Sequence, residues 1–163
     1  MSNRPAAERR PSLAVTIRQA APADTASIAR LACQLGYPST ETQVARRLQA
    51  LQDTPDSAVL VAESGGAAAS EAGPLLGWIH VSVNRLVESD PDAEIRGLVV
   101  DEGSRSAGVG RRLVEAAESW ALGRGFDTIS VRSNVIRDRA HRFYERLGYE
   151  RKKTQHKFRK RLS

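Results

Sequence analysis

One segment constrains the fold of this chain more than any other. Residues 94–100 predict a buried strand, and after a short loop the residues from Val109 onward place apolar side chains at helical spacing. The loop carries Gly108 and Gly110, which lack the side chains that would keep a ligand away from the backbone. A strand that runs through such a turn into a helix is typical of a layered α/β structure.

The same turn predicts an anion site. The first N–H groups of a helix have no acceptor within the helix, and the helix dipole is positive at that end. Arg105, Arg111 and Arg112 add full positive charges. The turn therefore suits an anion such as a pyrophosphate, and the alternative is that its glycines serve folding alone. It matches neither the Walker A loop nor the Gly-x-Gly-x-x-Gly pattern of dinucleotide binders.

Apolar patterns predict the remaining elements in the order strand, two helices, three strands, helix, strand, helix, strand. Further helices are expected from Pro22, after a cap at Ser39 or Thr40, and around residues 140–147. The other strands are expected at residues 15–19, 58–62, 75–83, 128–132 and, last, within 149–158. Residues 1–12 are expected to form a flexible tail, and residues 13–163 a single domain.

Composition excludes several classes of protein. A chain of 163 residues with 40% hydrophobic and 27% charged residues can form a packed core, so wholesale disorder is excluded. No apolar segment approaches the ~20 residues of a membrane span, and the basic start lacks a secretory apolar region, so we expect a cytoplasmic protein. The single Cys33 excludes an internal disulfide, and the three histidines lack metal-binding spacing, so no metal is expected.

Two motifs together resemble those of the GNAT superfamily of acetyl-CoA-dependent N-acetyltransferases. The family loop Arg/Gln-x-x-Gly-x-Gly/Ala is matched by residues 105–110, and the helix end Ala-x-x-x-Tyr-x-x-x-Gly-Phe/Tyr by residues 140–149. The order of elements between them is also the family's. The resemblance covers residues 14–158 and implies a central mixed, mostly antiparallel sheet flanked by helices, with a splayed parallel strand pair that forms the CoA cleft.

The resemblance implies that acetyl-CoA is the cosubstrate. Its pantetheine arm would pair with the strand edge at Leu98, Val99 and Val100. Family members often carry an asparagine seven residues before the tyrosine, where this chain has Arg137, so both Asn134 and Arg137 are candidates for contacting CoA. The pyrophosphate would be bound in the loop by Arg105, Ser106, Ala107, Gly108, Val109, Gly110 and Arg111.

The resemblance also implies catalytic candidates. A lysine-like amine is almost fully protonated at neutral pH, so acetyl transfer to it would benefit from a general base. Glu94 matches the base of the histone-acetylating branch, and the alternative is a solvated carboxylate that balances Arg96. Tyr144 matches the general acid that protonates the departing thiolate, although periodicity alone makes it a core residue. His80 either faces the acceptor cleft or is a satisfied strand histidine.

The acceptor is expected to be a primary amine of a small cationic molecule or a protein. An acidic loop would attract such a cation. The resemblance places the acceptor site within residues 35–51, 78–92 and the region after Tyr149. Dimers are frequent in the family, so a homodimer is a further expectation, with the last strand or the hairpin around residues 64–74 as its interface. The residues of the expected acidic loop are Glu88, Asp90, Asp92 and Glu94.

Two alternatives to an acetyltransferase remain. The formal net charge is +6, and much of the excess lies in the basic residues 151–161, which is compatible with nucleic-acid binding. That segment lacks the interleaved aromatic side chains of a base-stacking platform, which disfavours nucleic acid as the main partner. The second alternative is a GNAT-like protein that binds CoA without catalysis.

Overall fold

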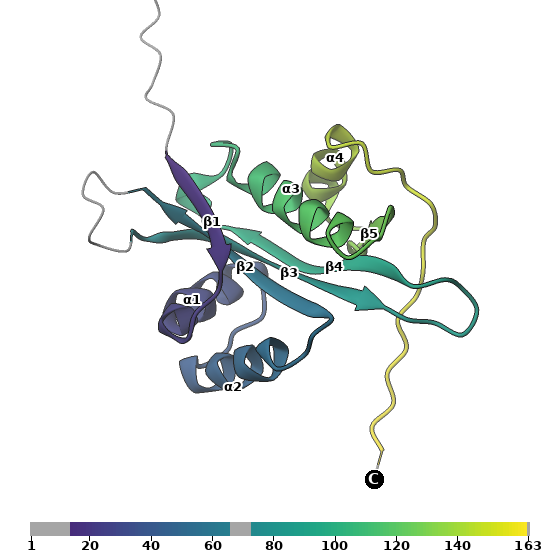
Figure 1. The fold of residues 1–163 in the computed structure, drawn as a ribbon, viewed down its shortest axis with the longest axis horizontal. Coiled ribbons are helices and arrows are strands. Elements are labelled where there is room, and N and C mark those ends of the chain that lie inside the picture. The colour runs from purple at the N-terminus through teal and green to yellow at the C-terminus, as the bar shows by residue number, and fades with distance from the viewer. Residues whose placement is uncertain (1–13, 66–72, 163) are drawn as a thin grey trace, which may run out of the picture. The chain divides into compact units, whose positions relative to one another are not determined.

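A five-stranded sheet dominates the structure, a computed structural model that describes residues 14–65 and 73–162. The chain divides into one compact unit that ends at Val131 and a second that begins at Arg132. The predicted tail at residues 1–12 lies outside the described residues. The sheet belongs to the first unit and has the order β1 (Val15–Gln19), β2 (Ser57–Ser64), β3 (Leu75–Asn84), β4 (Asp92–Val100), β5 (Ile129–Val131) (Figure 1).

The sheet is mixed, as expected. Strands β1 to β4 pair antiparallel, whereas β4 and β5 pair parallel, with Ala93 opposite Ile129 and Ile95 opposite Val131. Parallel neighbours need a long crossover connection, which helix α3 (Val109–Leu122) supplies here. The strand, glycine turn and helix that dominate the sequence therefore lie on the connection between the two parallel strands.

Helices cover both faces of the sheet. Helices α1 (Thr25–Leu35) and α2 (Glu41–Gln52) lie on one face, and α3 lies on the other (Figure 1). The α2 helix begins at Thr40, whose hydroxyl accepts from the Gln43 N–H while the Gln43 side chain accepts from the Thr40 N–H. The core under α1 and α2 consists of Ala20, Ile28, Ala29, Leu31, Val44, Leu48, Val59, Val61, Leu75 and Val99.

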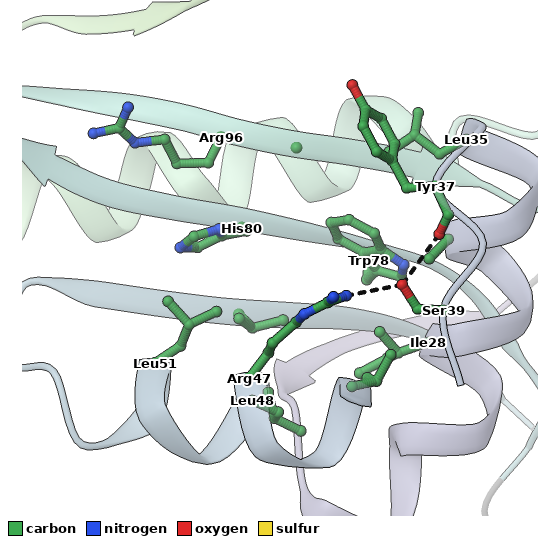
Figure 2. Close-up of a pocket in the computed structure, with 14 residues that line it drawn as sticks. Ile28, Leu35, Tyr37, Ser39, Arg47, Leu48, Leu51, Trp78, His80 and Arg96 are labelled. Atoms are coloured by element: carbon green, nitrogen blue, oxygen red, sulfur yellow. Dashed lines mark hydrogen bonds between the residues drawn. The ribbon is translucent and has the colours of Figure 1, made fainter. Parts of the chain in front are cut away.

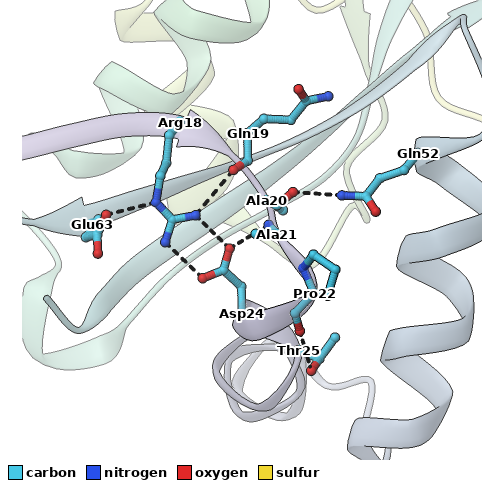
Figure 3. A network of polar contacts seen from close by, with 9 residues as sticks. All are labelled: Arg18, Gln19, Ala20, Ala21, Pro22, Asp24, Thr25, Gln52 and Glu63. Carbon is cyan, nitrogen blue, oxygen red and sulfur yellow. Dashed lines mark hydrogen bonds and ion pairs between the residues drawn. The ribbon is translucent and has the colours of Figure 1, made fainter. Parts of the chain in front are cut away.

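A polar network ties β1 to the start of α1 (Figure 3). The Arg18 guanidinium donates to both carboxylate oxygens of Asp24, at 2.7 and 2.9 Å, and to Glu63 on β2 at 2.8 Å. The Ala21 N–H also donates to Asp24, at 2.7 Å. The hydrogen bonds from Arg18 hold the pKa of Asp24 below its ordinary value, so a nearly buried carboxylate stays charged and fixes the entry into α1.

The second unit holds helix α4 (Asp138–Arg146), which ends before Gly148 at φ +91°. Within it, the Tyr144 ring makes edge contacts with Phe143 and Tyr149, at centroid distances of 5.1 and 5.4 Å. The strand expected within residues 149–158 is wrong, because residues 150–162 have no regular structure and are exposed. This stretch is dense in lysine and arginine, which are poor strand formers, and has few apolar side chains to bury.

No helix in the described parts of the chain is long and apolar enough to cross a membrane.

Candidate active site

The loop that follows β4 is anchored to α1 at its start. The Asp101 carboxylate accepts from Arg30 and, at 3.1 Å, from Gln34, both on α1. The Gln34 side chain in turn accepts from the Glu102 N–H at 3.1 Å. The hydrogen bond from Arg30 lowers the pKa of Asp101, so the carboxylate that holds the loop stays charged at neutral pH. These bonds fix where the chain leaves β4.

The loop itself exposes a row of backbone N–H groups. Ser106 adopts φ +73° and Gly108 φ +79°, both in the left-handed region that a side chain disfavours. Within residues 14–65 and 73–162, no acceptor is found for the N–H groups of Ser106, Gly108, Val109 and Gly110. Strained backbone with unpaired donors at a helix N-terminus is the arrangement that binds anions.

Positive side chains surround these donors. Arg111 lies exposed in the first turn of α3, and so does Arg112. Arg105 forms an ion pair with Glu102, at 3.2 Å between Nη2 and Oε1. The turn predicted from the glycines therefore has the backbone geometry and the charge that a pyrophosphate requires.

The edge of β4 next to this loop lacks a strand partner. Arg96 is an extra residue in the pairing with β3, because Val81 lies opposite Ile95 while His80 lies opposite Gly97. Such a bulge bends a strand and increases its twist. The pairing with β5 ends at Ile95, so among the described residues the outer edge of β4 from Leu98 to Val100 has no neighbouring strand.

Glu94 is buried, so the alternative of a solvated carboxylate at this position is wrong. It is 3% exposed and lies within the sheet, opposite Ser82 on β3 and Ser130 on β5. The predicted partnership with Arg96 is confirmed, at 3.0 Å between Nη1 and Oε2.

The expected acidic loop is only partly a loop. Asp92 and Glu94 belong to β4, and only Glu88 and Asp90 lie in the β3–β4 connection. Asp92 accepts hydrogen bonds from Asn84 at 3.1 Å and Ser130 at 2.9 Å, so it joins β3 to β5. Two of the four acidic residues are therefore part of the sheet and not of an exposed loop.

A pocket of about 440 Å³ opens on the face of the sheet that α1 and α2 cover (Figure 2). The Trp78 ring lies over Gly97, where a Cβ atom would stand only 3.1 Å from the indole. The Arg47 side chain reaches in from α2, and its Nη1 donates to Ser39 Oγ at 2.8 Å. The lining residues are Ile28, Ala32, Leu35, Tyr37, Ser39, Val44, Arg47, Leu48, Leu51, Val59, Trp78, His80, Arg96 and Gly97.

His80 lines this pocket and is hydrogen-bonded to Ser57 Oγ at 3.0 Å, as expected for a strand histidine with a satisfied ring. Burial, helped by the positive charge of Arg96, lowers the pKa of His80 to about 4. The imidazole is therefore neutral at neutral pH. Across residues 14–65 and 73–162, no three His, Cys, Asp or Glu side chains gather in a way that could hold a metal ion.

The family resemblance pointed to residues 35–51 and 78–92, which supply much of this lining, but no local pattern predicted the pocket itself. Period-two alternation places Trp78 and His80 on one face of β3, and helical spacing places Val44, Leu48 and Leu51 on one side of α2. Neither pattern reveals that the two helices and the sheet leave a space between them, which depends on tertiary packing.

The remaining candidates belong to the second unit. Asn134 forms the turn before α4, because its side chain accepts from the Ile136 N–H at 3.2 Å and its carbonyl from the Arg137 N–H at 3.0 Å. Arg137 is the residue that caps α4, and its carbonyl accepts from the Ala140 N–H at 2.9 Å. Tyr144 is half-buried, and burial raises its pKa to about 12, so its phenol remains protonated at neutral pH.

Comparisons with known proteins agree with this architecture. The model of the acetyltransferase (GNAT) family matches residues 25–149. An aminoglycoside N(6')-acetyltransferase type 1 from Stenotrophomonas maltophilia is 31% identical over 137 residues, covering 84% of this chain and 87% of that protein. An aminoglycoside N-acetyltransferase in complex with CoA has a TM-score of 0.79 at 18% identity, covering 96% of this chain and 100% of that one. An aminoglycoside 6'-N-acetyltransferase from Acinetobacter baumannii has a TM-score of 0.77 at 18% identity, covering 92% and 100%.

Proposed function

This chain belongs to the GNAT acetyltransferase family, and from that premise we propose that it transfers an acetyl group from acetyl-CoA directly to a primary amine. The observation that carries the proposal is the set of N–H groups of Ser106, Gly108, Val109 and Gly110, for which the described residues supply no acceptor, beside the edge of β4 that has no strand partner there. In the transfer, the amine nitrogen forms a C–N bond as the C–S bond breaks. The amine loses one proton and the departing thiolate gains one.

Binding of the donor is assigned to the loop and the strand edge. The N–H groups of Ser106 to Gly110 would bind the pyrophosphate, with Arg105 and Arg111 beside them. The backbone of Leu98 to Val100 would pair with the amide groups of the pantetheine arm, as an added strand does. This assignment of the pantetheine arm is supported by the end of the β4–β5 pairing at Ile95. Beyond Ile95, the backbone N–H and C=O groups on the outer edge of β4 have no strand partner among the described residues.

Glu94 is the proposed general base. Its carboxylate lies 3.0 Å from Arg96, and Arg96 lines the pocket, so Glu94 is one side chain away from the space assigned to the acceptor. Replacing Glu94 with Gln keeps the shape and removes the basicity. We expect turnover to fall about a hundredfold, within the range of general-base effects, with unchanged affinity for CoA. An unchanged rate would remove Glu94 from this role.

Tyr144 is the proposed proton donor to the thiolate. Because burial raises the pKa of Tyr144 to about 12, the proton moves to a thiolate of ordinary pKa ~8.5 only if that thiolate is also desolvated. The Tyr144→Phe variant should lose about a hundredfold in turnover while its affinity for CoA stays the same. Equal turnover of variant and parent protein would refute the assignment.

The experiment that tests the function has two parts. Acetyl-CoA at about 100 times its dissociation constant should raise the free energy of unfolding by ~2.7 kcal/mol, measured by thermal denaturation. Release of the CoA thiol is then followed with a panel of amines. Stabilisation without turnover would indicate a CoA-binding protein without catalysis. Absence of both, together with salt-sensitive nucleic-acid binding, would refute the acetyltransferase proposal.

A further inference from the structure

The charges around the pocket are of one sign. Its lining contains two arginines, Arg47 and Arg96, and no aspartate or glutamate among the described residues. The two arginines differ, because Arg96 forms an ion pair with Glu94, whereas no carboxylate in the described ranges lies within ion-pair distance of Arg47. Arg47 therefore contributes an uncompensated positive charge to the space assigned to the acceptor.

Arg47 also has unused hydrogen-bonding capacity. A guanidinium carries five N–H donors, and the one bond found for Arg47 is that from Nη1 to Ser39 Oγ at 2.8 Å. Ser39 in turn donates to the Tyr37 carbonyl at 3.3 Å, which holds the serine in place (Figure 2). The guanidinium is thus positioned by one N–H and leaves others for a ligand.

A second donor in the pocket lacks an acceptor. Trp78 Nε1 is buried, and no hydrogen-bond partner for it is found in residues 14–65 and 73–162. A buried N–H without an acceptor is costly and calls for an explanation. Because Nε1 has almost no accessible surface, the direct hydrogen bonds that a ligand can receive from this part of the pocket come from Arg47.

The rest of the lining is apolar. Leu48 and Leu51 come from α2, Ile28 comes from α1, and the Trp78 ring rests on Gly97. His80 is neutral and already bonded to Ser57. A hydrocarbon or aromatic body is therefore the group that this wall accommodates.

We propose that the acceptor is an amine whose apolar or aromatic body carries a carboxylate, which binds to Arg47. This inference rests on the proposed function and narrows its acceptor class. A polycation such as a polyamine or an aminoglycoside is disfavoured, because its added ammonium groups would approach Arg47, whose charge no carboxylate in the lining balances. The acceptor class thus differs from the aminoglycosides after which the related acetyltransferases are named.

The test compares matched amines by thiol release from acetyl-CoA. Phenylalanine is paired with phenylalaninamide, and 6-aminohexanoate with 6-aminohexanamide, while spermidine and kanamycin represent polycations. For at least one pair, kcat/KM for the carboxylate should exceed that for its amide about tenfold or more, as expected for a charge-assisted hydrogen bond. It should also exceed kcat/KM for both polycations. Preference for a polycation, or equal rates for acid and amide in both pairs, would overturn the inference and leave the proposed function intact.

Two variants test whether the pocket causes the preference for the carboxylate over its amide. Arg47→Gln should abolish the difference between acid and amide, mainly through KM for the acid. Arg46→Gln is the matched control, because Arg46 is exposed on the same helix, as Arg47 is, but does not line the pocket. A preference that survives in Arg47→Gln, or disappears equally in Arg46→Gln, contradicts the assignment.

A binding measurement separates this inference from the proposed function. N-acetylphenylalanine has the features of a product, and calorimetry detects its binding without turnover. Binding that Arg47→Gln weakens about tenfold, in a protein that turns over no amine, would support the pocket chemistry and refute the catalytic proposal. Absence of both binding and turnover would refute both.

Discussion

His80 should make the folded protein sensitive to mild acid. Its pKa is lowered to about 4 in the folded state, whereas an exposed histidine titrates near 6.5. Between these values the unfolded chain binds the proton and the folded one does not, so the free energy of unfolding falls as pH decreases. From about pH 7 to about pH 5 the two pKa values give a loss of about 1.8 kcal/mol, and solvent access to the half-buried ring places the expected loss between about 1 and about 1.8 kcal/mol.

The assay is urea unfolding, followed by far-ultraviolet circular dichroism at the two pH values. His80→Gln keeps a group that can bond to Ser57 but does not titrate, so the variant should lose about 1–1.8 kcal/mol less than the parent protein on acidification. The control is His156→Gln, which removes an exposed histidine that does not line the pocket, and the effect of His80→Gln is compared with it. If the parent protein and His80→Gln lose the same stability between the two pH values, the reasoning is refuted.

Three further changes test the scaffold and the loop. Gly77→Ala would place a Cβ 2.5 Å from a backbone carbonyl oxygen of β4, and should lower the free energy of unfolding in urea by about 2 kcal/mol or more; a neutral effect would contradict the packing. Arg18→Met leaves the Asp24 carboxylate nearly buried without its cation and should cost about 3 kcal/mol, part of which Asp24→Asn in the same chain should restore if the lost pairing is the cause. Gly108→Ala and Gly125→Ala impose the same strain, about 1 kcal/mol each, because both glycines have φ near +80° and open space at Cβ. Only Gly108→Ala should weaken CoA binding, about tenfold by calorimetry, and equal weakening in both would refute the role of the loop.

Short sequence patterns predicted most helices and strands correctly, because the start and end of such an element depend on residues close together in the chain. The cap at Thr40, the ends of α1 and α4 at Gly36 and Gly148, and the glycine turn before α3 each depend on a few neighbouring residues. The strand expected near the C-terminus was wrong, since alternation in a strongly basic segment does not provide a partner strand. The parallel pair of β4 and β5 was implied by the family resemblance and is confirmed.

The chemistry of the site was harder to predict, because it depends on what surrounds each residue. Glu94 looked like a residue at a strand end, and only the pairing on both sides of β4 shows that it is buried. Asp92 looked like part of an acceptor-attracting loop, yet it bonds to Asn84 and Ser130. Arg47 carried no signal, since an arginine on a helix is usually solvated, and its importance comes from the space that the tertiary structure leaves beside it.

The extra residue in β4 changes the phase of that strand. Glu94 and Gly97 lie opposite Ser82 and His80, which are two residues apart on β3, so three steps along β4 correspond to two along its neighbour. Beyond Arg96 each side chain therefore points to the face of the sheet opposite to the one that it would take in a regular strand. This inversion directs Val99 into the core beneath α1 and α2. A substitution at Arg96 preserves the inversion, whereas removal of the residue would cancel it. The pocket floor, the hydrophobic core and the donor edge of β4 thus depend on the number of residues in one strand as much as on their identity.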